Sequence, residues 1–528
     1  MRVTRRRLLA VAILVVWAGV VATQVRLEYF RPLSERLEIG AAMLAPGTVF
    51  YLARMGDAPV GLATSRLDTV PDGFVAEDRL ILDVPVQGGA QRAVAHTRVE
   101  LTRALGLREF LFDLDSDAGR FAVTGEARGD TILEVAVSAG SGAERSTLRL
   151  DDGLVLPTVL PLRLAAGGGL RVGESRRLRL FDPSTLSGRE IELRVAAHDT
   201  LLVADTATWD GARREWVPVP DTLAAWQLEE RFGGIVVTSW VDRDGRLIRA
   251  ESPLGITLER VPYEVVRAEW DRARSQPQAA SGYGAIIEST AIASNVRLDG
   301  VGTTDRLRVR LAGVSLEGFD LAGGRQSVRG DTLVVEREDP AALDAGYLLP
   351  YGPAPDGRSG AGRGAGVGGP PTALESALES TPLIQAGDPR IIEAARRVAG
   401  GERDPVVVAR LLNDWVHRTL RKDLVPSVPS AVQVLEAGRG DCNEHTVLYV
   451  ALARSLGLPA RTAAGLVHLD GRFYYHAWPE VWLGEWVAVD PTLGQFPADA
   501  SHLRFVVGGL ARQVELIRLI GQLRVEVL

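Results

Sequence analysis

GRGDCNEHTVLYVALARSLGLPAR, residues 438–461, contains the only cysteine of the 528-residue chain, just where a helix is predicted to begin. Asp441 and Glu444 form a D-x-x-E pattern, which is typical of a helix N-terminus with reciprocal capping hydrogen bonds. Apolar residues then recur at helical spacing, and a Gly-Leu-Pro sequence ends the helix. Cys442 is therefore predicted to lie in the first turn of this helix.

The predicted position of Cys442 favours a reactive thiol. Free backbone N–H groups and the positive end of the helix dipole point at the first turn, and both stabilise a thiolate. A structural cysteine would be expected on the apolar stripe of the helix. Cys442 precedes that stripe and has polar neighbours on both sides.

A thiolate nucleophile requires a base, and the base requires a group that orients it. His476 lies in the predicted strand FYYHAWPEVWL (473–483), and the predicted strand WVAVD (486–490) follows after a tight turn. An antiparallel hairpin of these two strands brings His476 opposite or diagonal to Asp490, within side-chain reach. Cys442, His476 and Asp490 are therefore the predicted nucleophile, base and orienting acid.

Two other assignments are open for this region. His445 lies three residues after Cys442 and could face it on the helix, although no acid is placed to orient it. Cys442, His445 and His476 could also bind zinc, but they lack the paired spacing of known zinc sites. The other histidines after residue 400 are expected to be solvated, surface or packing residues: His417, His468 and His502.

The rest of the chain divides into segments of different composition. The sequence predicts a multidomain protein in which a β-rich region with antiparallel sheets precedes an α+β domain. Asp242 to Gly245 is predicted to be a hairpin turn within the β-rich region. The predicted segments are an N-terminal anchor or signal segment (1–29), a β-rich domain (30–271), a small β domain (284–350), a Gly/Pro linker (351–371) and the α+β domain (372–528).

The N-terminal segment reads MRVTRRRLLAVAILVVWAGVVATQ, with four arginines before an apolar run from Leu8 to about Thr23. A basic region followed by an apolar region is typical of a secretory signal or a signal anchor. Because positive charge stays on the cytoplasmic side, a single-pass anchor would place the bulk of the chain outside the cytoplasm. Cleavage of the segment would instead give a secreted protein.

Several classes of function are disfavoured by the sequence. A formal net charge of -7 gives no basic surface for nucleic acid. The G-x-G-x-x-G match at 364–369 lies in the Gly/Pro linker, where no strand precedes it and two prolines follow, so it does not predict a dinucleotide site. No cofactor is predicted. A single cysteine also excludes a disulfide within the chain.

The stretch at 438–461, together with YYHAWPEVWLGEWVAVDPT (474–492), resembles the transglutaminase-like superfamily, whose members share a papain-like thiol fold. The resemblance covers roughly residues 385–500. It implies that Cys442 is the nucleophile, His476 the general base and Asp490 the residue that orients the base. Animal transglutaminases carry Gln before and Trp after the cysteine, whereas Asp and Asn flank it here. The sequence is therefore more similar to the bacterial branch, which includes proteases and amidases, and calcium dependence is not implied.

The sequence as a whole predicts a membrane-anchored, extracytoplasmic thiol enzyme that acts on amide or peptide bonds of a protein or peptide. A Cys442 thioester would form and be resolved by water, as in a protease or amidase, or by an amine, as in a transglutaminase. The alternative is a non-catalytic cell-envelope binding or assembly protein that uses its β-rich region.

Overall fold

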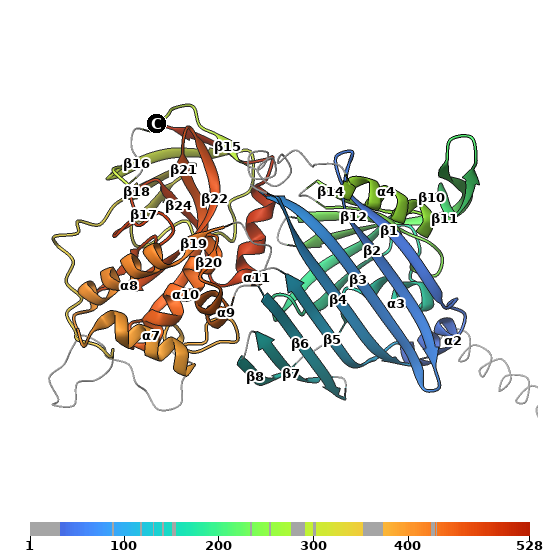
Figure 1. Cartoon of the computed structure of the whole chain (residues 1–528), viewed down its shortest axis with the longest axis horizontal. Coiled ribbons are helices and arrows are strands. Elements are labelled where there is room, and N and C mark those ends of the chain that lie inside the picture. The colour runs from blue at the N-terminus through green and yellow to red at the C-terminus, as the bar shows by residue number, and fades with distance from the viewer. Residues whose placement is uncertain are drawn as a thin grey trace, which may run out of the picture.

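The computed structural model describes most of the chain (Figure 1). The predicted anchor at 1–29 lies outside the described residues, as does the predicted linker at 351–371 apart from Tyr351. Among the described residues, no helix combines the length and the apolar character that crossing a membrane requires. The described residues are 32–86, 89–116, 119–129, 131–139, 142–149, 155–232, 235–252, 255–275, 291–298, 302–351, 373–423, 428 and 430–528.

An antiparallel sheet of 14 strands forms the N-terminal region and confirms the predicted β-rich region (Figure 1). Consecutive strands are neighbours from β1 to β8 and again from β9 to β14, and β1 pairs with β14 to join the two series. The strands are β1 (Gly47–Met55), β2 (Ala58–Val70), β3 (Gly73–Val86), β4 (Gly89–Thr102), β5 (Leu107–Ser116), β6 (Gly119–Arg128), β7 (Ile132–Ala139), β8 (Gly142–Arg149), β9 (Ser175–Asp182), β10 (Ser187–Asp210), β11 (Glu215–Phe232), β12 (Ile235–Val241), β13 (Leu247–Glu251) and β14 (Ile256–Arg260).

In the described part of the chain, three helices accompany this sheet. α2 (Leu33–Ala41) and α3 (Leu160–Ala166) contact each other, and their buried side chains complete two apolar clusters with the strands. α4 (Tyr263–Ser275) packs against β1, β2, β10 and β11. The helices therefore bury apolar strand faces that an open sheet would leave in water.

The hairpin turn predicted at Asp242–Gly245 is present between β12 and β13. The Asp242 carboxylate accepts hydrogen bonds from the backbone N–H groups of Asp244 (3.0 Å) and Arg246 (2.9 Å). Gly245 has a φ of 77°, a conformation that costs little only for glycine. The Asp-x-Asp-Gly sequence therefore explains the tight turn.

The C-terminal region packs helices against a second sheet, which confirms the predicted α+β class (Figure 1). Its strands lie in the order β15-β22-β21-β24, and β23 pairs with β22. α7 and α8 begin at capping aspartates followed by proline, as the Asp404-Pro405 sequence predicts. The elements are α6 (Ala373–Ser376), α7 (Pro389–Ala399), α8 (Pro405–Thr419), α9 (Ala431–Ala437), α10 (Cys442–Ser455), β15 (Ile292–Ala293), β21 (Ala460–Leu469), β22 (Arg472–Trp482), β23 (Trp486–Ala488), β24 (His502–Val507), α11 (Leu510–Gln513) and the 3-10 helix η1 (Val514–Leu519), with two short strands, β19 (Arg421–Lys422) and β20 (Arg439–Gly440), paired in parallel.

Helix α10 lies at the centre of this region. The side chains from Glu444 to Ala453 are buried, and they pack against α7, α8, α9 and the sheet. A helix buried on every side has a fixed position, because any shift would open cavities in a close-packed core. The first residue of α10 is therefore held firmly relative to β22.

The strands within the segment predicted as a small β domain do not form a sheet of their own. β16 (Arg306–Ala312) lies between β18 (Thr332–Glu336) and β25 (Arg524–Val527), with β17 (Gln326–Arg329) outside β18. Side chains from these strands and from β21, β22 and β24 share one apolar cluster. The division of the chain into domains stays a prediction, but this segment is continuous in sheet and core with the C-terminal region.

A buried carboxylate connects this segment to the sheet of β21, β22 and β24. Glu480 on β22 accepts hydrogen bonds from Arg461 on β21 (2.8 and 2.6 Å) and from Arg504 on β24 (3.0 Å). The Arg504 guanidinium also donates to three backbone carbonyls of residues 320–323. One arginine thus connects β22 to the loop that precedes β17.

We expect Glu480→Gln to lower the free energy of unfolding of the C-terminal region by about 3 kcal/mol, because the change leaves the buried Arg504 charge without its carboxylate. Denaturant unfolding followed by tryptophan fluorescence measures the loss. Glu485→Gln is the matched control, since Glu485 is exposed at the β22–β23 turn. Equal stability of the two variants would contradict the role given to Glu480.

The two regions touch where the β5–β6 turn meets α9. The Gln433 side chain donates a hydrogen bond of 2.5 Å to the backbone carbonyl of Arg120. Val428 and Leu383 of the C-terminal region pack against the apolar cluster of the large sheet. Since α9 packs directly on α10, the large sheet lies close to the helix that carries Cys442.

Candidate active site

Cys442 is the first residue of α10, as the sequence predicts. The Asp441 carboxylate accepts from the Asn443 N–H (2.8 Å), and the Glu444 carboxylate accepts from the Asp441 N–H (2.9 Å), so the reciprocal cap is complete. A Cβ atom on Gly440 would lie 2.2 Å from Cβ of Glu444. The Gly-Asp-Cys-x-Glu sequence therefore encodes the local geometry: glycine leaves room for the capping glutamate, and the cap starts the helix at the cysteine.

Cys442 faces the middle of strand β22. Its side chain is partly buried and packs against the apolar cluster that includes Ala477, the residue after His476. In the described part of the chain, β22 pairs on this side with β15 at residues 472–473 and with β23 from residue 480 onwards. The strand edge between these positions is free for the thiol, which places Cys442 beside the predicted base.

The resting thiol is less acidic than the helix start alone suggests. Burial raises the pKa of Cys442 well above its usual value, and the negative charges of Asp441, Glu444 and Asp490 add to the effect. The Ala477 N–H lowers the pKa but does not compensate. The prediction that the thiolate is favoured in the free protein is therefore wrong, because burial and three nearby carboxyl groups raise the pKa of the thiol.

His476 contacts Asp490, which is the contact predicted from the hairpin. Its Nε2 atom lies 2.8 Å from Oδ2 of Asp490. The β22–β23 pairs place Glu480 opposite Ala488 and Trp482 opposite Trp486, so the turn lies at Leu483–Glu485 as expected. Asp490 follows β23 and returns toward His476 in the next stretch of chain. Because Asp490 occupies Nε2, Nδ1 is the ring nitrogen that remains for a further partner.

Asp490 is fully buried and held as a carboxylate. Its Oδ1 atom accepts from the backbone N–H groups of Thr492 (2.8 Å) and Leu493 (2.9 Å). Burial favours the neutral acid, but the charge and hydrogen bond of His476, together with those of His502, lower the pKa of Asp490 well below its usual value. Asp490 is therefore ionised whenever the protein is folded near neutral pH.

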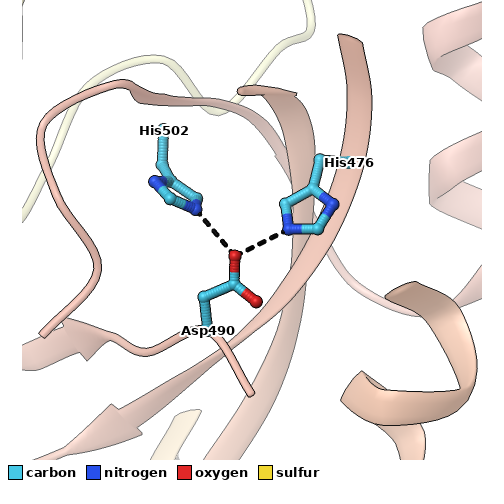
Figure 2. Close-up of side chains that lie close together, drawn as sticks. All are labelled: His476, Asp490 and His502. Carbon is cyan, nitrogen blue, oxygen red and sulfur yellow. Dashed lines mark hydrogen bonds and ion pairs between the residues drawn. The ribbon is translucent and has the colours of Figure 1, made fainter. Parts of the chain in front are cut away.

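His502 is the site residue that sequence reasoning missed. It was expected to be a surface or packing residue, but its side chain is fully buried, and its Nε2 atom lies 3.0 Å from the same Asp490 oxygen that contacts His476. Figure 2 shows both rings directing one nitrogen at this oxygen. His502 reaches the site because β24 pairs with β21, with Val467 opposite His502. That pairing is long-range, so no local pattern could predict it.

The other histidines have structural surroundings. His445 is buried in α10. Its Nδ1 donates a hydrogen bond of 2.7 Å to the backbone carbonyl of Asp441, one helical turn earlier. His468 is also buried, not solvated as expected, and its ring packs on Phe473. His417 is partly buried and contacts the carbonyl of Pro491 (3.0 Å), beside Asp490. None of these three replaces His476 as the ring hydrogen-bonded to Asp490.

The residues that could bind a metal ion in the structure differ from the possible zinc site considered in the sequence. Cys442, His445 and His476 do not form a metal-binding group among the described residues, whereas one atom each of His476, Asp490 and His502 lies within 4.8 Å of the others. Hydrogen bonds already account for the contacts between these three residues. A metal ion there would replace those bonds.

The comparisons with known proteins identify the C-terminal region. Residues 392–491 match the model of the transglutaminase-like superfamily. This region contains a transglutaminase-like domain. The resemblance seen in the sequence is thereby confirmed. Members of the superfamily are typically cysteine enzymes, so the domain supports a thiol enzyme in general terms.

Matches to solved structures are distant. A Cytophaga hutchinsonii protein named "Putative Cysteine Protease" is 13% identical, covers 42% of this chain and 83% of its own, and has a TM-score of 0.28. A β-barrel-like protein with a domain of unknown function from Brucella abortus is 14% identical over 41% of this chain and 95% of its own, with a TM-score of 0.31. The comparison with curated proteins gave no match.

The transglutaminase-like domain should lose stability in acid. Burial opposes the charge of Asp499, but hydrogen bonds and the charge of His502 lower its pKa to about 2, and the pKa of Asp490 is lowered as well. In the unfolded chain both groups titrate near 3.9. Their stabilisation is therefore present above about pH 4 and is lost as the pH falls toward about 2.

We expect Asp499→Asn to lower stability at pH 6 and to flatten its fall between pH 5 and pH 2, since the variant no longer loses this carboxylate. Unfolding midpoints across that range provide the measurement. Asp470→Asn is the control, because Asp470 lies on an exposed turn. A wild-type midpoint that does not change from pH 5 to pH 2 would refute the expectation.

Proposed function

We propose that the transglutaminase-like domain catalyses acyl transfer from amide or peptide bonds, with Cys442 as nucleophile, His476 as general base and acid, and Asp490 as the group that orients His476. The observation that carries the proposal is that Cys442, the first residue of α10, packs against the part of β22 around Ala477, next to a histidine whose Nε2 is hydrogen-bonded to a buried carboxylate. Nucleophile, base and orienting acid are the parts that such chemistry requires.

In the proposed reaction, Nδ1 of His476 accepts the thiol proton while the sulfur attacks the carbonyl carbon. The resulting tetrahedral intermediate collapses by breaking the carbon–nitrogen bond, and His476 returns the proton to the leaving amine. A thioester on Cys442 remains. Water or another amine then attacks it, again giving a proton to His476, which finally protonates the departing thiolate. The products are a carboxylic acid or a new amide.

The raised pKa of the thiol fits proton transfer during the attack better than a preformed thiolate. A positioned base of this kind contributes about 10²–10⁴-fold to the rate. The backbone N–H of Cys442 begins α10 and accordingly has no acceptor within the helix, so it is the natural first donor to the oxyanion. Substrate binding near this N–H would complete the site.

The proposed substrate is a protein or peptide outside the cytoplasm. Support comes from the sequence: four arginines precede the apolar run from Leu8 to about Thr23, which favours an anchor with the bulk of the chain on the outer side. Full-length protein should stay with the membrane fraction in high salt, and a chain that begins at residue 32 should be soluble. Release of the full-length protein by salt alone would contradict anchoring.

Trapping the acyl-enzyme tests the proposed chemistry. The full chain is incubated with a library of glutamine-containing and unblocked peptides, quenched in acid and analysed by intact mass and peptide mapping. The prediction is an added acyl mass on Cys442 that hydroxylamine removes, and no adduct in Cys442→Ala. An adduct elsewhere, or product formation by the variant, would overturn the assignment.

The same assay separates hydrolysis from transamidation. Adding a primary amine probe should either incorporate the probe into the peptide or leave only the carboxylic acid. Lys422 is the only lysine in the chain, so self-labelling through lysine has only one possible site. Probe incorporation would support the transferase form of the proposal, and acid alone would support the protease or amidase form.

A binding role for the large sheet is the second candidate function. Strands β4 to β8 line a depression of about 630 Å³, which is within the usual size range of ligand pockets. Across it, Glu100, Glu109, Glu126 and Glu134 lie directly opposite one another on successive strands. If binding is the whole function, Cys442→Ser should leave the cellular phenotype of the protein unchanged.

A further inference from the structure

Both ring nitrogens of His502 face acceptor atoms. Nε2 lies 3.0 Å from Oδ2 of Asp490, and Nδ1 lies 3.2 Å from Oδ1 and 3.3 Å from the carbonyl of Asp499. An ionised carboxylate and a backbone carbonyl cannot donate a hydrogen bond. A neutral imidazole has one N–H and one lone pair, so one of these contacts would set a lone pair against an oxygen.

The two aspartates are fixed as acceptors by other donors. Asp499 accepts from the N–H (3.0 Å) and hydroxyl (2.5 Å) of Ser501 and from the N–H of Gly302 (2.8 Å). Asp490 accepts from two backbone N–H groups on its other oxygen. Each carboxylate is therefore satisfied in its ionised form, and the proton needed for both contacts has to reside on His502.

We propose that His502 is a buried imidazolium and a positioning residue of the active site, acting on His476 through Asp490 in a chain Asp499–His502–Asp490–His476. This inference rests on the proposed function for its catalytic consequence, although the charge state of His502 is testable without any substrate. A positively charged ring between two buried carboxylates gives each of them an ion-pair partner, whereas burying the carboxylates unpaired would cost a large desolvation free energy. Burial opposes the ring charge, but the hydrogen bonds and charges of the two aspartates raise the pKa of His502.

The imidazolium has two effects on His476. It shares Oδ2 of Asp490, which fixes the carboxylate where it accepts the Nε2–H of His476 and so keeps Nδ1 available as the base. It also offsets the negative charge of Asp490 near the thiol and the base. Removing it would raise the pKa of the Cys442 thiol further, since a nearby positive charge favours the thiolate.

The groups around His502 come from several elements. Asp490 and Asp499 contact the ring directly, and the His476 ring lies 5.7 Å from it between centroids. The indole of Trp478 meets the ring edge-on at 5.2 Å and carries no charge. Beyond Asp499, Arg325 and His468 act on that carboxylate through space. The two contacting charges are both negative, which favours the imidazolium.

Nitrogen-15 NMR of the full chain with labelled histidine tests the charge state directly. The expected result is a His502 ring with both nitrogens protonated from pH 5 to pH 8, assigned by its absence in His502→Gln. A ring with one unprotonated nitrogen in this range would overturn the proposal. So would a stoichiometric metal in the purified wild-type protein that is missing from His502→Gln, because His502 would then be a ligand.

The pH dependence of Cys442 alkylation tests the effect on the site. In His502→Gln we expect the inflection to move up by about one pH unit, and alkylation at pH 7 to slow about tenfold. His468→Gln, which removes another buried histidine, should leave the inflection unchanged. An unshifted inflection in folded His502→Gln would refute the positioning role. If no peptide is ever turned over, the proposed function fails. The NMR and alkylation measurements would still test the charge and the positioning role of His502, because neither needs a substrate.

Discussion

Cys442→Ala is expected to lower kcat/KM for any peptide substrate by about 10⁶-fold. In a catalytic triad, removal of the nucleophile alone costs nearly as much activity as removal of all three residues. The loss should appear mainly in kcat, since alanine keeps the backbone N–H and the shape of the first turn of α10. Steady-state kinetics on the best peptide from the trapping library, at fixed pH, measure the effect.

Two controls make the Cys442→Ala result interpretable. The unfolding midpoint of the variant should match that of the wild type, because the thiol is only partly buried. Cys442→Ser should be nearly as inactive, since a hydroxyl is far harder to deprotonate than a thiol. Activity within about tenfold of the wild type in either variant would show that the chemistry resides elsewhere.

Asp490→Asn has the second largest expected effect. An asparagine can donate its amide N–H to Nε2 of His476, which favours the tautomer with the proton on Nδ1, the nitrogen that should act as base. The same Asp→Asn change lowers kcat about 10⁴-fold in the Ser-His-Asp triad of serine proteases. The buried ring of His502 also loses a carboxylate on one side. We therefore expect a simultaneous loss of about 3 kcal/mol in the free energy of unfolding.

Measuring both quantities separates the two roles of Asp490. Kinetics should be recorded well below the unfolding midpoint, and the unfolding curves should be compared with those of Asp470→Asn, whose carboxylate is exposed. A drop in kcat without any loss of stability would contradict the shared carboxylate between His476 and His502. A loss of stability with normal kcat would remove Asp490 from the catalytic unit.

Local signals made most of the candidate site predictable. The D-x-x-E cap and the apolar stripe fixed the start of α10 at Cys442, because capping depends on residues within one turn. The His476–Asp490 contact could be derived because a short hairpin fixes its own register. The alternating strands of the large sheet were equally readable, since each pairs with a neighbour in the sequence.

Long-range packing accounts for what the sequence could not predict. His502 joins the site only through the pairing of β24 with β21. The segment around β16 joins the C-terminal sheet region through β25, more than 200 residues away along the chain. The thiol pKa depends on burial and on three carboxyl groups, of which Asp490 is distant in sequence. Each of these features is set by tertiary structure, where local patterns carry no information.

The most direct test of the central claim is the rate of Cys442 alkylation at pH 7 in the wild type and in His476→Ala. The chain has one cysteine, so every label reports on Cys442, and no substrate is needed. We predict a fall of about 100-fold or more in His476→Ala, because the partly buried thiol depends on that ring to accept its proton. His445→Gln should keep the wild-type rate. Equal rates in the wild type and His476→Ala would contradict the account, since His476 would then not be the base for Cys442.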